Sequence, residues 1–266
     1  MQADTKTSQG PAAIAYALVF ALWLAAVFAY ARTQRPVAFN GGMGWDGARY
    51  EVMYQQAVDG QRFVAEKPFA YRIATPWIAA HLGFADARRA FHAVNLLSVL
   101  LTGFLLLAMM RALGARTAPS VFLVALFFLQ WHAPLRQQFY DSFGVDPASQ
   151  PFTCLIFLAH FLIRRPAPRY AILALLAFVG VFFRESVLFA AAAVWLAELT
   201  AAARGPGLRT ALRAPAARNS ALPLLAGLIG IAITHRLADA TGPYGFFNTV
   251  AYYLYHKPLP VLMHAF

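Results

Sequence analysis

The sequence of 266 residues contains a single cysteine, Cys154, which stands in an apolar run. One cysteine excludes an internal disulfide framework and a metal site built from several thiolates. The seven histidines show no ligand spacing such as His-x-x-x-His, so a structural metal has little support. We therefore expect no cofactor and no metal ligand, and a divalent metal ion stays an alternative that no spacing supports.

Charged residues are scarce as well. They make up 12% of the chain, whereas 60% of the residues are hydrophobic and the mean hydropathy is +0.55. About a quarter of the residues in a typical soluble domain are charged, and such a domain cannot bury this much apolar surface. Charge-free runs recur along the whole chain. The sequence therefore predicts an all-α, polytopic membrane bundle that forms a single domain over 1–266.

The net charge of +11 does not indicate a nucleic-acid-binding protein. The basic residues stand in short loops between apolar runs, where membrane topology explains them better than binding to a phosphate backbone does. We expect membrane lipids among the partners and no nucleic acid.

About seven to eight transmembrane helices are expected. The first, 11–31, is longer than the apolar core of a signal peptide (about 7–15 residues), so we interpret it as an uncleaved helix. The stretch 170–203 would be about 50 Å long as one helix, against a bilayer core of about 30 Å. A hairpin of two short helices keeps the arginine clusters before and after it on one membrane face, which the positive-inside rule favours. The expected order is 11–31, an outer loop 32–86 with interfacial helices, 87–111, 117–135, 147–163, the hairpin 170–183 and 185–203, 219–236, and an outer segment 241–266 that could begin an eighth span.

Two details of the outer loop are predicted from local patterns. Tyr50, Met53, Tyr54 and Ala57 repeat at helical spacing, which indicates a short helix lying in the membrane interface. Asp86 has the place of an N-cap for the span 87–111.

The two signs of charge fall on opposite sides of this topology. With the amino terminus in the cytoplasm, the arginines between 111 and 116, 164 and 169, and 204 and 218 are cytoplasmic. Of the carboxylates, only Asp4 and Glu198 share that side. Because the positive-inside rule counts only Lys and Arg, the position of the carboxylates is partly independent information. It predicts an acidic site that faces outward.

Three aspartates are candidates for that site. Asp46 could cap the helix that follows it, which is the commoner role, or act as a general base. Asp146 precedes Pro147, and the pair has the form of an N-cap with a first-turn proline. Asp141 has no capping role that would explain it, although a carboxylate in a loop is most often simply solvated.

Arg184 and Glu185 lie at the apex of the predicted hairpin. Adjacent residues on a helix do not face each other, so they are not an intrahelical ion pair. Near the outer surface Arg184 could bind a lipid-linked phosphate through its guanidinium fork, or it could extend to the lipid headgroups. Tyr71-Arg72 offers a second phosphate contact or an interfacial anchor, and Trp45 belongs either to an aromatic belt or to a platform for sugar rings.

The Trp-Asp-Gly sequence at 45–47, the aromatic helix after it and the Tyr-Arg-x-x-x-Pro pattern at 71–76 resemble the first outer loop of GT-C type integral-membrane glycosyltransferases. The loop 136–146 and the Arg184-Glu185 apex are similar to features of bacterial members. The chain departs from the family in being short and in having no second acid beside Asp46.

The resemblance implies transfer of a sugar from a polyprenyl-phosphate donor to a lipid or glycan acceptor, on the outer face of the bacterial inner membrane. Asp46 would be the catalytic residue. The substrate-binding side chains would be Trp45, Tyr71, Arg72, Asp141, Arg184 and Glu185. Two alternatives stay open. A transporter or flippase would need charges deep in several spans and internal repeats. For a non-catalytic assembly protein, no single outer carboxylate would matter.

Overall fold

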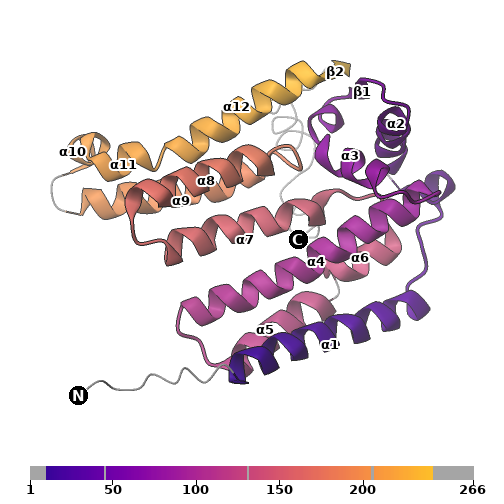
Figure 1. The fold of residues 1–266 in the computed structure, drawn as a ribbon, viewed down its shortest axis with the longest axis horizontal. Coiled ribbons are helices and arrows are strands. Elements are labelled where there is room, and N and C mark those ends of the chain that lie inside the picture. Colours follow the sequence, from indigo (N-terminus) through magenta and orange to yellow (C-terminus); the bar gives the residue numbers. More distant parts are fainter. Residues whose placement is uncertain (1–9, 45, 131, 205–206, 242–266) are drawn as a thin grey trace, which may run out of the picture.

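The computed structural model describes residues 10–44, 46–130, 132–204 and 207–241, which form a bundle of helices (Figure 1). The bundle consists of α1 (Gly10–Thr33), α4 (Ala87–Ala112), α5 (Thr117–Leu129), α7 (Asp146–Leu162), α8 (Pro166–Gly180), α9 (Val187–Ala203) and α12 (Leu222–Leu237). The shorter elements are η1 (Phe39–Gly42), α2 (Gly47–Val58), β1 (Phe63–Glu66), η2 (Phe69–Tyr71), α3 (Ala74–His81), α6 (Pro134–Tyr140), α10 (Leu208–Arg213), α11 (Pro215–Asn219) and β2 (Ala238–Thr241).

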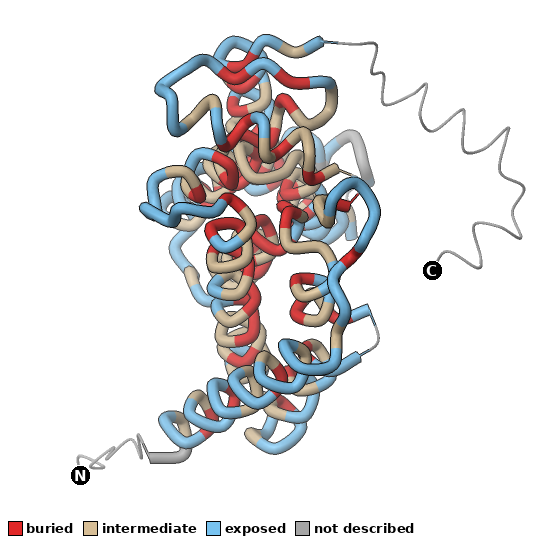
Figure 2. Tube along the Cα trace, turned by 90° about the vertical axis from the view of Figure 1, so that its right-hand side faces the viewer, coloured by how far each residue is buried: buried red, intermediate tan, exposed pale blue. Residues whose placement is uncertain are grey.

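Four helical stretches of the described chain are long and apolar enough to cross a membrane. They are Ala12–Thr33, Ala87–Ala112, Thr117–Tyr140 and Pro215–Leu237. Buried residues follow the inner faces of the helices (Figure 2). Large apolar side chains such as Phe122 and Phe189 are exposed. Exposed apolar helix faces of this kind are normal against lipid and unusual against water. The fold is therefore that of a helical membrane protein.

The stretch 170–203 is divided between α8 and α9, which are apolar helices of 15 and 17 residues. Arg184 and Glu185 lie in the turn between them. The helix α7 also has 17 residues and is not among the four long stretches. That α7, α8 and α9 each cross the membrane stays a prediction.

The two ends of the bundle differ in structure. α2, α3, α6, β1 and β2 gather at one end, which we call the loop end, and α10 and α11 lie at the other (Figure 1). The loop end carries Asp46, Glu51, Asp59, Glu66, Asp141, Asp146, Glu185 and Asp239. The opposite end carries Arg111, Arg116, Arg164, Arg165, Arg204, Arg213 and Arg218. The carboxylates that the sequence assigns to one side are thus together at the loop end.

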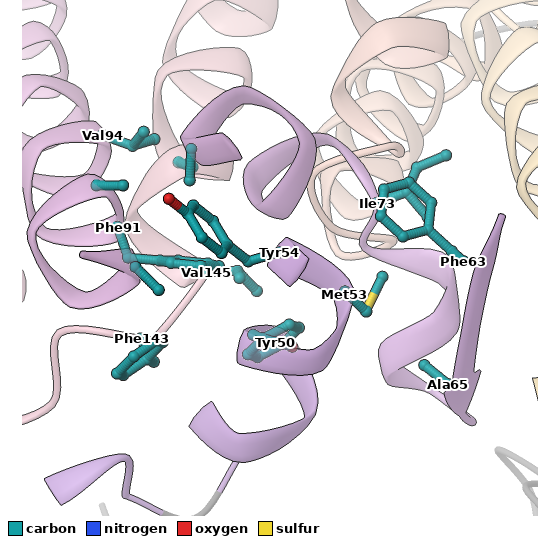
Figure 3. Packing of buried hydrophobic residues seen from close by; sticks show 14 of the residues in the cluster. Tyr50, Met53, Tyr54, Phe63, Ala65, Ile73, Phe91, Val94, Phe143 and Val145 are labelled. Carbon is teal, nitrogen blue, oxygen red and sulfur yellow. The ribbon is translucent and has the colours of Figure 1, made fainter. Parts of the chain in front are cut away.

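The apolar stripe of α2 that predicts an interfacial helix is buried within the protein, and the place of α2 in the membrane interface stays a prediction. Tyr50, Met53 and Tyr54 are at most 4% exposed. Figure 3 shows them between Phe91 of α4 on one side and Ile73 on the other. The apolar stripe therefore fastens α2 to the bundle, because protein side chains cover it more completely than an interface would. The prediction for Asp86 is confirmed, since its carboxylate accepts a hydrogen bond from the Arg88 backbone at 3.1 Å.

A short parallel pairing of β1 with β2 is the one addition to the all-helical expectation among the described residues. Phe63 is opposite Ala238 and Glu66 is opposite Thr241. An ion pair between Arg62 and Asp239, 3.2 Å apart, lies next to the pairing. The segment between α1 and α4 is thereby fixed to the end of α12. The segment 241–266, apart from Thr241, lies outside the described residues.

Candidate functional site

A pocket of about 310 Å³ opens at the loop end; we call it the central pocket. Its wall includes Asp46, Arg72, Asp141 and Arg184, four of the seven predicted site residues. They come from the start of α2, the residue after η2, the end of α6 and the turn between α8 and α9. These four segments are far apart in sequence, and the fold brings their charges to one cavity.

Three hydrogen bonds from its guanidinium group hold Arg72 in place. Its Nη2 and Nε donate to the two carboxylate oxygens of Glu185 at 2.8 and 3.2 Å, and Nη1 donates to the Tyr50 hydroxyl at 3.1 Å. Only 8% of Arg72 is exposed. Burial alone would lower the pKa of Arg72, but its bonds to Glu185 and Tyr50 raise it, so its positive charge is permanent. Since Glu185 occupies the guanidinium fork, Arg72 acts on a ligand mainly through its charge.

The two partners of Arg72 are shifted by the same arrangement. Burial would raise the pKa of Glu185, but the hydrogen bonds and charge of Arg72 outweigh burial and lower it. Burial raises the pKa of Tyr50 to about 12, against the opposing effect of Arg72. Glu185 is thus a carboxylate that orients Arg72, and it does not itself line the central pocket.

Arg184 forms an ion pair with Asp146, and both residues line the central pocket. Asp146 is therefore not the N-cap that the Asp-Pro pattern predicts. α7 begins at Asp146, Val145 has the cap position, and no side-chain capping bond forms. Burial and the nearby positive charge of Arg72 lower the pKa of Arg184. Arg184 keeps one carboxylate partner that is 59% exposed, so it is the arginine better able to receive an anion.

Asp46 occupies the N-cap position of α2, yet its side chain forms no capping hydrogen bond. Its backbone carbonyl accepts from Arg49 and Tyr50, whereas its carboxylate accepts no hydrogen bond from any described residue. The commoner, capping role therefore does not account for this side chain. Asp46 presents an uncommitted carboxylate to the central pocket.

Asp141 lies close to Asp46 because the chain turns at Gly44. Gly44 has φ +70°, and a Cβ atom there would lie 2.6 Å from the Asp141 carboxylate. The Asp141 side chain also accepts a hydrogen bond from the Phe143 backbone at 3.2 Å. Burial, followed by the negative charge of Asp46, raises the pKa of Asp141. The two acids thus have different environments within one pocket.

Two of the described site predictions, Tyr71 and Glu185, are not among the residues that line the central pocket. Tyr71 stacks on His235 of α12, with ring centroids 4.0 Å apart. Glu185 is connected to the pocket through its hydrogen bonds from Arg72. Trp45 lies outside the described residues.

Sequence reasoning missed several residues of the wall, namely Tyr50, His132, Gln137, Gln138 and Gln150. It weighed Asp146 but explained it as a helix cap. One signal against that explanation was present, because Asp146 and Gln150 are four positions apart and so lie on one face of α7.

No group of three or more His, Cys, Asp or Glu side chains in the described chain is arranged to hold a metal ion. Comparisons of the chain with protein-family models, with curated proteins and with solved structures give no match. Function therefore has to be inferred from the geometry of the central pocket.

Proposed function

We propose that this protein is a membrane glycosyltransferase that transfers a sugar from a polyprenyl-phosphate donor to an acceptor hydroxyl. The observation that carries the proposal is the convergence of an uncommitted carboxylate, Asp46, and a receptive arginine, Arg184, in the central pocket. Transfer from a phosphate ester needs a base for the acceptor and a cation for the leaving group.

In the proposed step, Asp46 takes the proton from the acceptor hydroxyl as its oxygen forms a bond to the sugar C1. The bond between C1 and the phosphate oxygen breaks, and its electron pair leaves with the polyprenyl phosphate. Arg184 exchanges Asp146 for the phosphate, and Arg72 adds a fixed positive charge. Both cations stabilise the negative charge that develops on the leaving group.

An apolar groove of about 670 Å³ supports a lipid-linked donor. It is lined by Trp77, Ile78, Phe182, Phe183 and Leu237, among others. Phe183 precedes Arg184, and Ile73 of the same groove follows Arg72. Each arginine of the central pocket is therefore one residue away from an apolar wall, which suits a phosphate attached to a hydrocarbon chain.

The proposal includes the finer topology. α8 and α9 would rise about 22 and 25 Å, short of a core of about 30 Å, so they would cross together with their polar turn near the outer surface. With these two and α7, the count reaches seven spans, or eight if the segment after 241 crosses. The arginine-rich end would then be cytoplasmic and the loop end would face outward from the bacterial inner membrane.

The test is Asp46→Asn, assayed in membranes for sugar transfer from polyprenyl-phosphate donors with protein abundance followed in parallel. Transfer should fall roughly 10²–10⁴-fold, the usual contribution of a general base, at normal abundance. Asp59→Asn is the matched control, because Asp59 has the C-cap position at the other end of α2 and is exposed. Full activity of Asp46→Asn would remove Asp46 as the base.

A wild-type protein that transfers no sugar from any donor would overturn the whole proposal. A transporter or a non-catalytic assembly protein would then be the better reading of the same pocket.

A further inference from the structure

Two glutamines of the central pocket each have a side-chain oxygen that could accept a hydrogen bond from a ligand. The Oε1 atoms of Gln138 and Gln150 are buried and have no partner among the described residues, and both glutamines line the pocket. Gln138 is only 1% exposed, and its Nε2 donates to the Pro134 carbonyl at 3.3 Å. Buried polar atoms normally have partners, so an unpartnered acceptor at a pocket wall points to a ligand that donates.

The wall around the two glutamines restricts the charge of that ligand. It is continuous with the carboxylates of Asp46, Asp141 and Asp146. Arg184 pairs with Asp146 and Arg72 with Glu185, so Asp46 and Asp141 are the acids left to repel a negatively charged group on the glutamine side. A neutral group with several hydroxyls would donate to the glutamine oxygens and to the acids, because each hydroxyl both donates and accepts.

The pocket continues into a second cavity of about 200 Å³, which we call the polar side pocket. His132 and Gln137 line both cavities, and Gln34, Arg136 and Tyr140 complete the second. Arg136 is held in place by a 2.7 Å hydrogen bond from its Nε to Gln34. Amides, imidazole, guanidinium and an exposed phenol ring suit a sugar, which combines hydroxyl groups with a face that stacks on aromatic rings.

The apolar groove provides a contrast. None of the described residues that line it also lines the central pocket, and its walls are mainly aromatic and aliphatic. The polar side pocket shares two residues and has no aliphatic side chain in its lining. A hydrocarbon chain is therefore suited to the groove and not to the side pocket.

We infer that the glutamine side of the central pocket and the polar side pocket form one binding site for a neutral saccharide of at least two rings. The inference rests on the proposed function in one respect: the inner ring is the transferred sugar and the outer ring belongs to the acceptor. The acceptor is then a saccharide, recognised by Gln137 and Tyr140 beyond the reacting sugar.

The experiment measures saccharide binding by the full chain in detergent micelles, with saturation-transfer NMR and no donor lipid. The probes are glucose and N-acetylglucosamine, the disaccharides cellobiose, maltose and chitobiose, and glucuronic acid as the anionic case. At least one disaccharide should bind roughly tenfold more tightly than its monosaccharide, about what one or two further hydrogen bonds contribute. Glucuronic acid should bind more weakly than glucose.

Variants test the glutamine side of the central pocket and the polar side pocket separately. Gln138→Met should weaken mono- and disaccharides alike by roughly tenfold, because one hydrogen bond to the inner ring is lost. Tyr140→Ala should weaken only the disaccharide. Gln61→Ala is the matched control, since Gln61 is an exposed glutamine on the apolar groove. Gln150→Ala replaces Gln138→Met if the latter does not fold, as judged by its melting temperature.

Failure of this inference can be told apart from failure of the proposed function. Asp46→Asn should bind saccharides as the wild type does while losing transfer. Saccharide binding with the expected variant pattern, in a protein that never transfers sugar, would keep the site and overturn the enzyme. Absence of saccharide binding, equal binding by both variants, or preference for glucuronic acid would each overturn the inference, even in an active transferase.

Discussion

The same three groups meet at both ends of this molecule. At the loop end Arg72 pairs with Glu185 and donates to the Tyr50 hydroxyl. At the opposite end Arg169 pairs with Glu198 at 2.9 Å and donates to the Tyr170 hydroxyl at 3.0 Å. The Arg72 cluster takes one residue, Glu185, from the turn between α8 and α9, whereas all three residues of the Arg169 cluster belong to these two helices. Their chemistry alone therefore does not distinguish a site from a clamp.

The two clusters differ in the residues that surround them. The Arg169 cluster joins α8 to α9 within the bundle, and its carboxylate lies 3.8 Å from His160. The Arg72 cluster borders the central pocket, where Arg184 and three further acids are present. An ion pair that only closes a hairpin serves the fold. The same pair beside an open pocket also orients charge toward a ligand.

Removing the arginine that can change partners should have the largest effect. Arg184→Ala should lower transfer roughly 10²–10³-fold, as expected when one stabilising group for a developing charge is lost. Its melting temperature in detergent should stay near that of the wild type, because Arg184 pairs with a largely exposed carboxylate. Arg169→Ala is the control at the other end. It should lower the melting temperature and leave the rate per folded molecule unchanged, and the reverse pattern would contradict the comparison.

A smaller effect is expected for the carboxylates of the two clusters. Glu185→Gln should cost about 2 kcal/mol of stability, between the values for exposed and buried pairs because Glu185 is about one-third exposed. It should also lower transfer, since Arg72 loses its orientation. Glu198→Gln should lower stability alone. Equal transfer by the two variants would show that Arg72 has no part in the site.

Two glycines with left-handed backbone provide a finer comparison. Gly44→Ala puts a Cβ atom 2.6 Å from the Asp141 carboxylate, whereas Gly60→Ala meets nothing within 4 Å. Both carry the cost of an unfavourable φ, about 1 kcal/mol or more. Only Gly44→Ala should also displace Asp141 and reduce transfer severalfold. Similar activity of the two variants would show that the position of Asp141 is unimportant.

The smallest effect concerns pH. The pKa of Glu185 is lowered in the folded state, so its charge contributes stability that is fully present above the unfolded value of 4.5. That contribution is lost as the pH falls through the lowered folded value. The difference in melting temperature between the wild type and Glu185→Gln should therefore be constant near neutral pH and shrink below pH 4.5. A difference that grows on acidification would contradict the pairing.

Apolar runs made the helices readable from the sequence, because a long run without charge has few other structures available. The division of α8 from α9 was also readable, since Arg184-Glu185 interrupts an otherwise apolar stretch. The charge pattern placed Asp46, Arg72 and Arg184 on one side, and the family resemblance grouped them as one site. The residues that complete the wall of the central pocket were not predicted.

Long-range pairing could not be read from the chain. Asp146 matches a local capping pattern, and only the fold reveals that its partner is Arg184. The short strand β1 has no turn signal that would link it to β2. The face of α2 was assigned to the interface because helical spacing gives a stripe but not the surface that covers it.

The pairing of β1 with β2 has a consequence for biogenesis. Phe63 finds its partner Ala238 only after 175 further positions have been synthesised, as the separation of Arg62 from Leu237 also shows. At about 5–20 residues per second, the interval is roughly 9–35 s. During that time β1 has no partner strand. The segment between α1 and α4 is thus among the first parts of the loop end to be made and among the last to be completed, and a chain that stops before α12 is finished leaves β1 without β2.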